Sequence, residues 1–152
     1  MSADLYHNRV LELAASIPHL GRLEDPDATV ERVSRICGST IVLDLKLDAS
    51  KAHVTGIAVD PRACALGQAA TSILAEHAIG ASIEEIRAAR DALKAMLKHD
   101  APPPEGRFAE LRHLAGVADY TPRHASTLLA FEAAVDAIDK ILAGQGEVTA
   151  TP

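Results

Sequence analysis

Two short segments in the first half of the chain alternate apolar and polar residues, and the two cysteines of the sequence flank them. Every second residue from Ile41 to Leu47 is apolar, which is the pattern of a strand with one buried face. After a short polar link, the segment 54–59 is predicted to return as the antiparallel partner. A hairpin brings the end of its second strand back to the start of its first. Cys37, before the first strand, and Cys64, after the second, are therefore expected at the same end of a sheet.

The remainder of the chain is predicted to be mainly helical. Apolar residues recur there at spacings of three and four, which is the period of a helix with one buried face. Ser82 and Glu85 form a capping box, and Thr121-Pro122 is typical of a helix start. Helices are expected over residues 5–17, from Cys64 to Gly80, from Ser82 to the prolines 102–104, over 108–114 and from Thr121 to Gly144, and a further strand over 29–36.

These elements define the expected fold class and domain organisation. Three strands and about five helices predict an α+β fold in which a three-stranded antiparallel sheet is packed with helices. A chain of 152 residues is long enough for one domain with its own core. We expect a single domain over residues 1–146 and a flexible tail over 147–152.

Charge and composition argue against several classes of partner. The formal charge is −6 and no run of basic residues occurs, whereas nucleic acids and anionic membranes attract clustered Lys and Arg. No apolar stretch is long enough to span a bilayer, and no signal peptide is recognisable. Two cysteines without a secretory signal are typical of reduced thiols, so a cytoplasmic protein is expected.

The two cysteines are also the residues most suited to chemistry. Cys64 lies at a predicted helix N-terminus, where the helix dipole favours a thiolate, and Cys37 precedes a glycine in a turn. Two such thiolates could bind a soft metal, although a pair of buried structural cysteines explains the same pattern. His124 lies in the first turn of the last predicted helix. No Ser-His-Asp order, phosphate loop or dinucleotide fingerprint occurs.

Several segments together resemble the iron–sulfur cluster assembly scaffold family, which comprises IscU, SufU and the N-terminal domain of NifU. Their order and spacing agree with that family over nearly the whole chain. The proline-rich segment and ELRHLAGV are similar to the insertion of the SufU branch, and the Leu-Pro-Pro-Val-Lys motif of the IscU branch is missing. The other matching segments are GRLEDPDATV, Cys37-Gly38 followed by TIVLDLKLD, Cys64-Ala65-Leu66 followed by AATSILAE, and RHASTLLAF at 123–131.

The resemblance implies a metal site built from three cysteines and the aspartate of a Cys-Gly-Asp motif. Cys37 and Cys64 match two of these positions. The aspartate position holds Ser39, and the third cysteine position aligns with Ser126, with Ala125 as the less favoured counterpart. Neutral serine hydroxyls are poor ligands for zinc or iron. The resemblance is therefore complete for the fold and partial for the site.

The function implied by the resemblance is that of an iron–sulfur cluster assembly scaffold, or a sulfur or metal carrier, and not that of an enzyme. Such a protein would receive sulfur from a cysteine desulfurase and hold an iron–sulfur cluster or zinc on Cys37 and Cys64. His124 would be a replacement ligand, or two copies in a homodimer would pool their cysteines. The alternative is a regulatory or binding module that keeps the fold without a cluster. A thiol redox protein is disfavoured because the sequence has no Cys-x-x-Cys.

Overall fold

The computed structural model describes residues 6–36, 38–144 and 147–150, and for the last four residues only the backbone. The elements confirm the predicted α+β fold. They are, in chain order, α1 (Asn8–Ala15), β1 (Ala28–Val33), β2 (Thr40–Leu47), β3 (Val54–Arg62), α2 (Ala65–Ala78), α3 (Ile83–His99), the 3-10 helices η2 (Gly106–Asp119) and η3 (Thr121–Arg123), α4 (His124–Leu142) and β4 (Glu147–Ala150).

The predicted hairpin forms one side of the sheet, with β3 as its edge strand. Strands β2 and β3 are antiparallel, with Thr40 opposite Arg62, and β1 pairs antiparallel with the other edge of β2. The reversal after β2 is stabilised by Asp48, whose carboxylate accepts hydrogen bonds from the Ala52 amide and the Ser50 hydroxyl, both at 2.9 Å. The first half of the chain therefore folds as its apolar alternation predicts.

The end of the chain differs from the sequence-based expectation. The sequence predicts a flexible tail over residues 147–152, whereas Glu147–Ala150 forms β4, which pairs in parallel with β1 and extends the sheet order to β3-β2-β1-β4. The physical reason is the outer edge of β1, whose backbone groups would otherwise have no strand partner. Residues 151 and 152 lie outside the described part.

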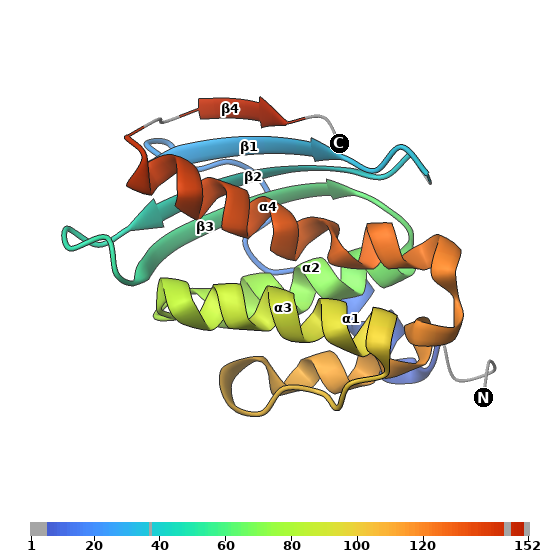
Figure 1. The fold of residues 1–152 in the computed structure, drawn as a ribbon. Helices are drawn as coiled ribbons and strands as arrows, with labels where there is room; N and C mark the ends of the chain where they lie inside the picture. The colour runs from blue at the N-terminus through green and yellow to red at the C-terminus, as the bar shows by residue number, and fades with distance from the viewer. Residues whose placement is uncertain (1–5, 37, 145–146, 151–152) are drawn as a thin grey trace.

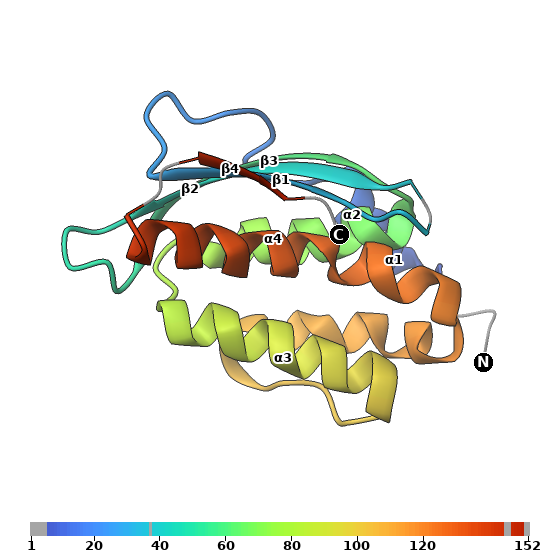
Figure 2. The same cartoon turned by 45° about the horizontal axis from the view of Figure 1, so that its top comes forward.

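The helices lie on one face of the sheet in two layers. Helices α2 and α4 pack against each other and against the strands, and α3 and η2 form the next layer outward (Figure 1). On the opposite face, the connection between α1 and β1 arches over the strands (Figure 2). The core between these layers is aliphatic, with the Phe108 and Phe131 rings packed edge to face at 5.7 Å.

Several element boundaries differ from the predicted ones. β1 ends at Val33 instead of continuing to residue 36, because the Ser34 amide donates to the Ser39 carbonyl and closes a turn. The segment predicted as a short helix over 108–114 is a 3-10 helix that continues past Gly116 to Asp119. Thr121-Pro122 begins the 3-10 turn η3, and α4 starts only at His124.

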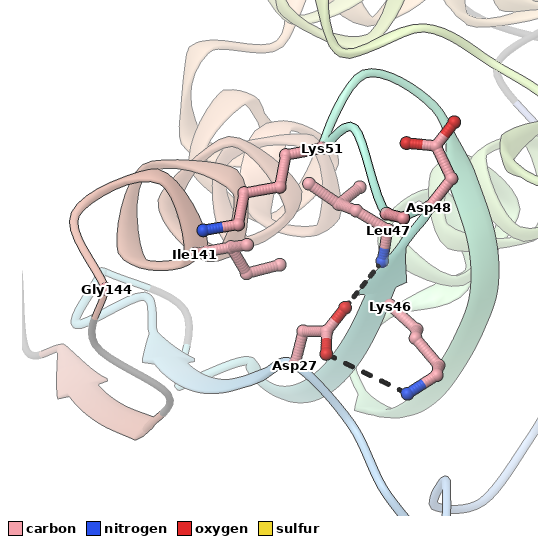
Figure 3. A pocket seen from close by; sticks show the side chains of 8 residues that line it. Asp27, Lys46, Leu47, Asp48, Lys51, Ile141 and Gly144 are labelled. Carbon is pink, nitrogen blue, oxygen red and sulfur yellow. Dashed lines mark hydrogen bonds and ion pairs between the residues drawn. The ribbon is translucent and has the colours of Figure 1, made fainter.

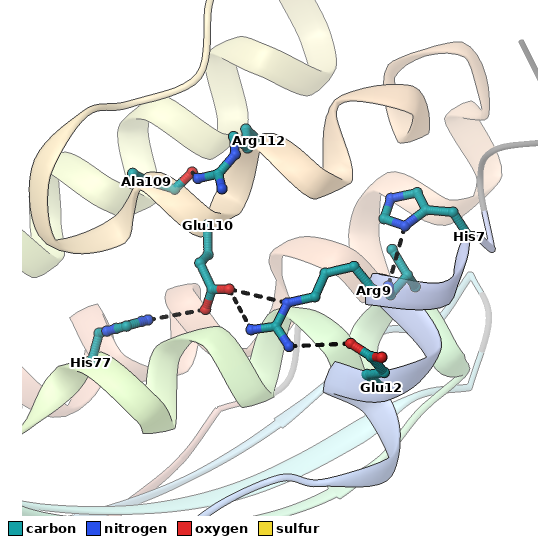
Figure 4. A network of polar contacts seen from close by, with 8 residues as sticks. His7, Arg9, Glu12, His77, Ala109, Glu110 and Arg112 are labelled. Carbon is teal, nitrogen blue, oxygen red and sulfur yellow. Dashed lines mark hydrogen bonds and ion pairs between the residues drawn. The ribbon is translucent and has the colours of Figure 1, made fainter.

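A polar network ties η2 to α1 and α2 (Figure 4). Glu110 accepts hydrogen bonds from Arg9 at 3.2 Å and from His77 at 3.1 Å, and Arg9 also pairs with Glu12. Burial alone would raise the pKa of Glu110, but the hydrogen bonds from Arg9 and His77 hold it below its ordinary value. This carboxylate fastens the segment that follows the prolines 102–104 onto the helical layer.

The capping box at the start of α3 is present as predicted. The Ser82 hydroxyl accepts from the Glu85 amide at 3.0 Å, and the Glu85 carboxylate accepts from the Ser82 amide at 2.9 Å. We expect Ser82→Ala to lower the free energy of unfolding by about 1 kcal/mol, because one first-turn amide loses its acceptor. Chemical denaturation measures this loss. The control is Ser16→Ala, since Ser16 caps α1 through its backbone amide. Equal losses in both variants would contradict the assignment.

Candidate functional site

The sheet register and the start of α2 define one end of the molecule, which we call the thiol end. It consists of Val33, Thr40, Arg62, Cys64 and Ser126. Val33 pairs with Thr40, and Thr40 pairs with Arg62, so the turn before β2 and the loop after β3 meet there. Cys37, predicted to lie in that turn, is outside the described residues. Its prediction as a partner of Cys64 remains a prediction.

Cys64 is the N-cap residue of α2 and is partly buried. Its Sγ lies 3.3 Å from the Ser126 Oγ in the first turns of α4. The Ser126 side chain is almost fully buried, and its hydroxyl can also donate to the Arg123 carbonyl at 3.3 Å. The structure thus brings together two of the positions that the sequence aligned with ligands. It also places the start of the last helix beside Cys64.

The close contact between Cys64 and Ser126 depends on Gly67. A Cβ atom at Gly67 would lie 2.9 Å from both the Ser126 carbonyl oxygen and the Ala63 Cβ. Real Cβ atoms do not approach backbone oxygens so closely, so any larger residue at position 67 would push the first turns of α2 and α4 apart. Sequence reasoning missed this role. A glycine inside a helix, which costs about 1 kcal/mol relative to alanine, is the signal that could have revealed it.

Ser39 lies next to Thr40 at the start of β2 and is buried, with 5% of its surface exposed. Its carbonyl accepts the Ser34 amide at 2.8 Å, which fixes the turn. Since Thr40 faces Arg62 across the hairpin, Ser39 belongs to the same end of the sheet as Cys64.

His124 occupies a different environment. Its Nε2–H donates to the carbonyls of Val117 at 3.0 Å and Ala118 at 3.1 Å, while its buried Nδ1 has no hydrogen-bond partner among the described residues. Residues two apart on a helix point in nearly opposite directions, and Ser126 faces Cys64. His124 accordingly lines a separate cavity with Leu97, Lys98, Asp100, Ala118, Asp119 and Thr121.

The described residues of the thiol end do not by themselves make up a ligand set for a metal ion. The described residues there supply one thiol, from Cys64, and neutral hydroxyls, among them those of Ser39 and Ser126. No group of three or more His, Cys, Asp or Glu side chains with metal-binding geometry occurs in residues 6–36, 38–144 and 147–150. A set of four thiolate, imidazole or carboxylate ligands, as zinc requires, does not occur at the thiol end within this described part.

A surface cavity of about 390 Å³ lies at the opposite end of the sheet (Figure 3). Three of its charged side chains, those of Asp27, Lys46 and Asp48, contact one another or the backbone. Asp27 accepts the Leu47 amide at 2.9 Å and lies 3.8 Å from the Lys46 ammonium group. These contacts organise the start of β1 and the end of β2, so this cavity has a structural explanation and is remote from Cys64.

The fold and the thiol end together define a small α+β protein. Its Cys64 lies at the N-terminus of α2 and contacts the first turns of α4. Residues 5–127 match the family described as the NifU-like N terminal domain, and the chain belongs to this family. No helix in the described part is long and apolar enough to cross a membrane.

Known relatives agree with this assignment. The chain is 31% identical over 122 residues to the iron–sulfur cluster assembly scaffold protein IscU of Streptococcus pyogenes serotype M1, covering 80% of this chain and 75% of the relative. The crystal structure of a nitrogen-fixing NifU-like protein (N-terminal) from Brucella abortus superposes with a TM-score of 0.89 at 46% identity, covering 92% and 96% of the two chains. The FiSufU structure from Fervidobacterium islandicum AW-1 has a TM-score of 0.81 at 19% identity over 91% and 99% of the chains, which shows the shared fold.

Proposed function

We propose that this protein acts in iron–sulfur cluster assembly as a scaffold or as a carrier of sulfur or metal. The observation that supports this most is the contact between Cys64 and Ser126. Cys64, at the N-terminus of α2, matches a cysteine position of the family, and Ser126 beside it aligns with a second ligand position. The cargo would be held on the thiolates of Cys64 and Cys37. A cysteine desulfurase would supply the sulfur, and the cytoplasm would be the compartment.

Two of the family's ligand positions hold serine, and this limits how well the protein could retain a metal ion or a cluster. Ser39 and Ser126 are neutral and buried, so neither offsets the charge of a bound metal ion. A single copy would therefore carry sulfur more readily than it retains a complete cluster. A cluster would need a replacement ligand, such as His124 after a rearrangement, or cysteines from a second copy.

The second candidate function is a regulatory or binding module that keeps the fold without a cluster. The same two buried serines favour it. A protein that only docks on a partner needs the outer surface of this fold, and it does not need the metal ligands of the family. In that case Cys64 would be a small packing residue of the α2–α4 interface. The two functions differ in whether Cys64 is chemically used.

The test is transfer of sulfur from a cysteine desulfurase. The protein, purified without an affinity tag, is incubated with a desulfurase and L-cysteine, and its mass is measured with and without a reductant. We expect reducible addition of sulfur to the parent, with the modified peptide containing Cys64 or Cys37. We expect none in the Cys37→Ser/Cys64→Ser double variant.

Iron, zinc and sulfide contents of the same preparations complete the test. A parent that acquires neither sulfur nor metal, yet still binds the desulfurase, would refute the carrier function and establish the binding module. The Ser50→Ala variant is the matched control, because it removes an exposed hydroxyl in the β2–β3 turn, far from the thiol end.

A further inference from the structure

The turn after β1 and the start of α4 enclose a small apolar hollow at the thiol end. The hollow has a volume of about 160 Å³ and is lined mainly by apolar atoms. Its α4 side is formed by Ala125, Leu129 and Glu132, which share one stripe of the helix because they are four and three residues apart. An apolar cavity of about 150 Å³ holds one group the size of benzene, so this hollow would accept one aliphatic side chain.

Ile36 stands at the mouth of this hollow. It is exposed over 76% of its surface, more than any other large apolar residue of the described part. A single exposed isoleucine is ordinary on a protein surface. This one borders an apolar hollow, so one small patch presents both an aliphatic side chain and a place for one. Figure 1 shows the β1–β2 turn projecting beyond the sheet at the end where α4 begins.

The rim of the hollow carries one charge of each sign, and the two do not pair within one molecule. The Arg35 guanidinium group has no hydrogen-bond or ion-pair partner among the described residues. Glu132 lies 3.5 Å from Arg32, which also pairs with Asp136. Arg32 therefore retains a carboxylate partner when Glu132 turns toward a second cation.

A surface with these features is complementary to a copy of itself. In a dimer with two-fold symmetry the same patch lies on both sides of the interface, and every contact occurs twice. Ile36 of each copy would enter the hollow of the other, and Arg35 would face the partner's Glu132. Both the apolar and the charged groups of the patch would then have a partner.

The patch adjoins the cysteine of the thiol end. Ala125 precedes Ser126, whose Oγ lies 3.3 Å from the Cys64 Sγ. A two-fold axis at the hollow would therefore bring the Cys64 residues of two copies to one interface. The second copy would supply a further thiol where the described residues of a single copy provide one.

We propose that the hollow between the β1–β2 turn and α4 is a homodimer interface, in which Ile36 of one copy occupies the hollow of the other and Arg35 pairs with the partner's Glu132. The inference deepens the proposed function and rests on it in one respect, since the dimer affects the cargo only if Cys64 holds it. The contact is small, so the dimer is weak and transient.

The experiment is sedimentation velocity at protein concentrations of roughly 10 to 500 µM, a range suited to a weak contact. A reductant prevents disulfide-linked dimers. At a salt concentration of about 150 mM, a Debye length of about 8 Å limits the general repulsion between copies that each carry a charge of −6. We expect the parent to change from monomer to dimer across this range.

Two substitutions test the apolar contact. Ile36→Asp should weaken association at least about tenfold, because a carboxylate replaces the inserted aliphatic side chain. Ala125→Leu fills the hollow, leaves Ile36 in place and should weaken association in the same way. The control is Leu142→Asp, which changes a half-exposed leucine at the other end of α4 and should have no effect.

Charge reversal tests the two-fold arrangement itself. Arg35→Glu would place two pairs of carboxylates face to face, and Glu132→Arg would do the same with guanidinium groups. Each variant alone should associate at least about tenfold more weakly than the parent. A mixture of the two variants restores both contacts between opposite charges, so it should form a heterodimer with about the parent's affinity. A mixture that associates no better than either variant alone would overturn the proposal.

The remaining outcomes separate this interface from the proposed function. A parent that is monomeric at every concentration would refute the interface, as would a dimer that no substitution weakens. If the parent is monomeric and Ile36→Asp abolishes binding to a cysteine desulfurase, the hollow belongs to that partner instead. Sulfur transfer is measured separately. A monomeric parent that accepts sulfur refutes the interface alone, and a dimeric parent that accepts none refutes the carrier function alone.

Discussion

Replacing Ser39 by aspartate and Ser126 by cysteine in one protein is expected to create a tight zinc site at the thiol end. The new thiolate and carboxylate would join Cys64 and Cys37 and complete the four-ligand set implied by the family pattern. Two sulfurs bound to one zinc ion at about 2.3 Å in tetrahedral geometry lie about 3.8 Å apart. The Cys64 Sγ and Ser126 Oγ are already 3.3 Å apart, so a sulfur at position 126 needs only a small adjustment.

The expected gain in zinc affinity over the parent is at least about a thousandfold, which corresponds to about 4 kcal/mol. Competition with a chromophoric chelator measures it. Each single variant should show an intermediate affinity. A control carrying the same new residue types at exposed positions, Ser16→Asp with Ser50→Cys, should bind zinc no better than the parent.

Two results would contradict this expectation in different ways. A parent that binds zinc as tightly as the double variant would show that another residue, with His124 first to be tested, has taken the vacant place. A double variant that folds without binding zinc would refute Ser126 as the third ligand position.

Asp44→Ala is expected to be the most destabilising of the substitutions considered, by about 3 kcal/mol at neutral pH. The Asp44 carboxylate is fully buried beneath the connection between α1 and β1, the blue loop above the sheet in Figure 2. It accepts hydrogen bonds from the Arg22 guanidinium at 2.7 Å and 3.1 Å, the Leu23 amide at 2.9 Å and the Thr29 hydroxyl at 2.6 Å. Without it, the amide and the hydroxyl lose their acceptor.

Chemical denaturation tests this prediction, and Asp60→Ala is the matched control. Asp60 lies on the neighbouring strand, but its carboxylate is half exposed and is 3.9 Å from Arg62, so its loss should cost less than about 1 kcal/mol. Equal losses in the two variants would mean that the buried cluster contributes nothing beyond an exposed ion pair.

The contribution of Asp44 should also depend on pH in a defined direction. Burial alone would raise the pKa of Asp44, but hydrogen bonds from Arg22, Thr29 and the Leu23 amide together hold it below its ordinary value of 3.8. A depressed pKa in the folded state stabilises the protein above the unfolded pKa, and this stabilisation is lost as the pH falls through the folded pKa. The stability difference between the parent and Asp44→Asn should therefore be constant above about pH 5 and shrink below it.

The sequence by itself determined the parts of this protein that depend on local periodicity and chain direction. The alternation from Ile41 to Leu47 and the returning segment 54–59 were sufficient to predict the hairpin, because side chains on a strand have a period of two. The capping box at Ser82 was equally local. The order of the family segments identified Cys64 and Ser126 as related positions.

Tertiary structure alone decided the features that arise between elements distant in the chain. The same alternation places Asp44 on the polar face of its strand, and only the packing of the α1–β1 connection buries it. β4 forms because a sheet edge elsewhere offers it hydrogen bonds. The role of Gly67 depends on how closely α2 approaches α4, and no local pattern encodes the distance between two helices. Side-chain burial and hydrogen-bond partners are properties of the packed chain, so they appear only when its layers are assembled.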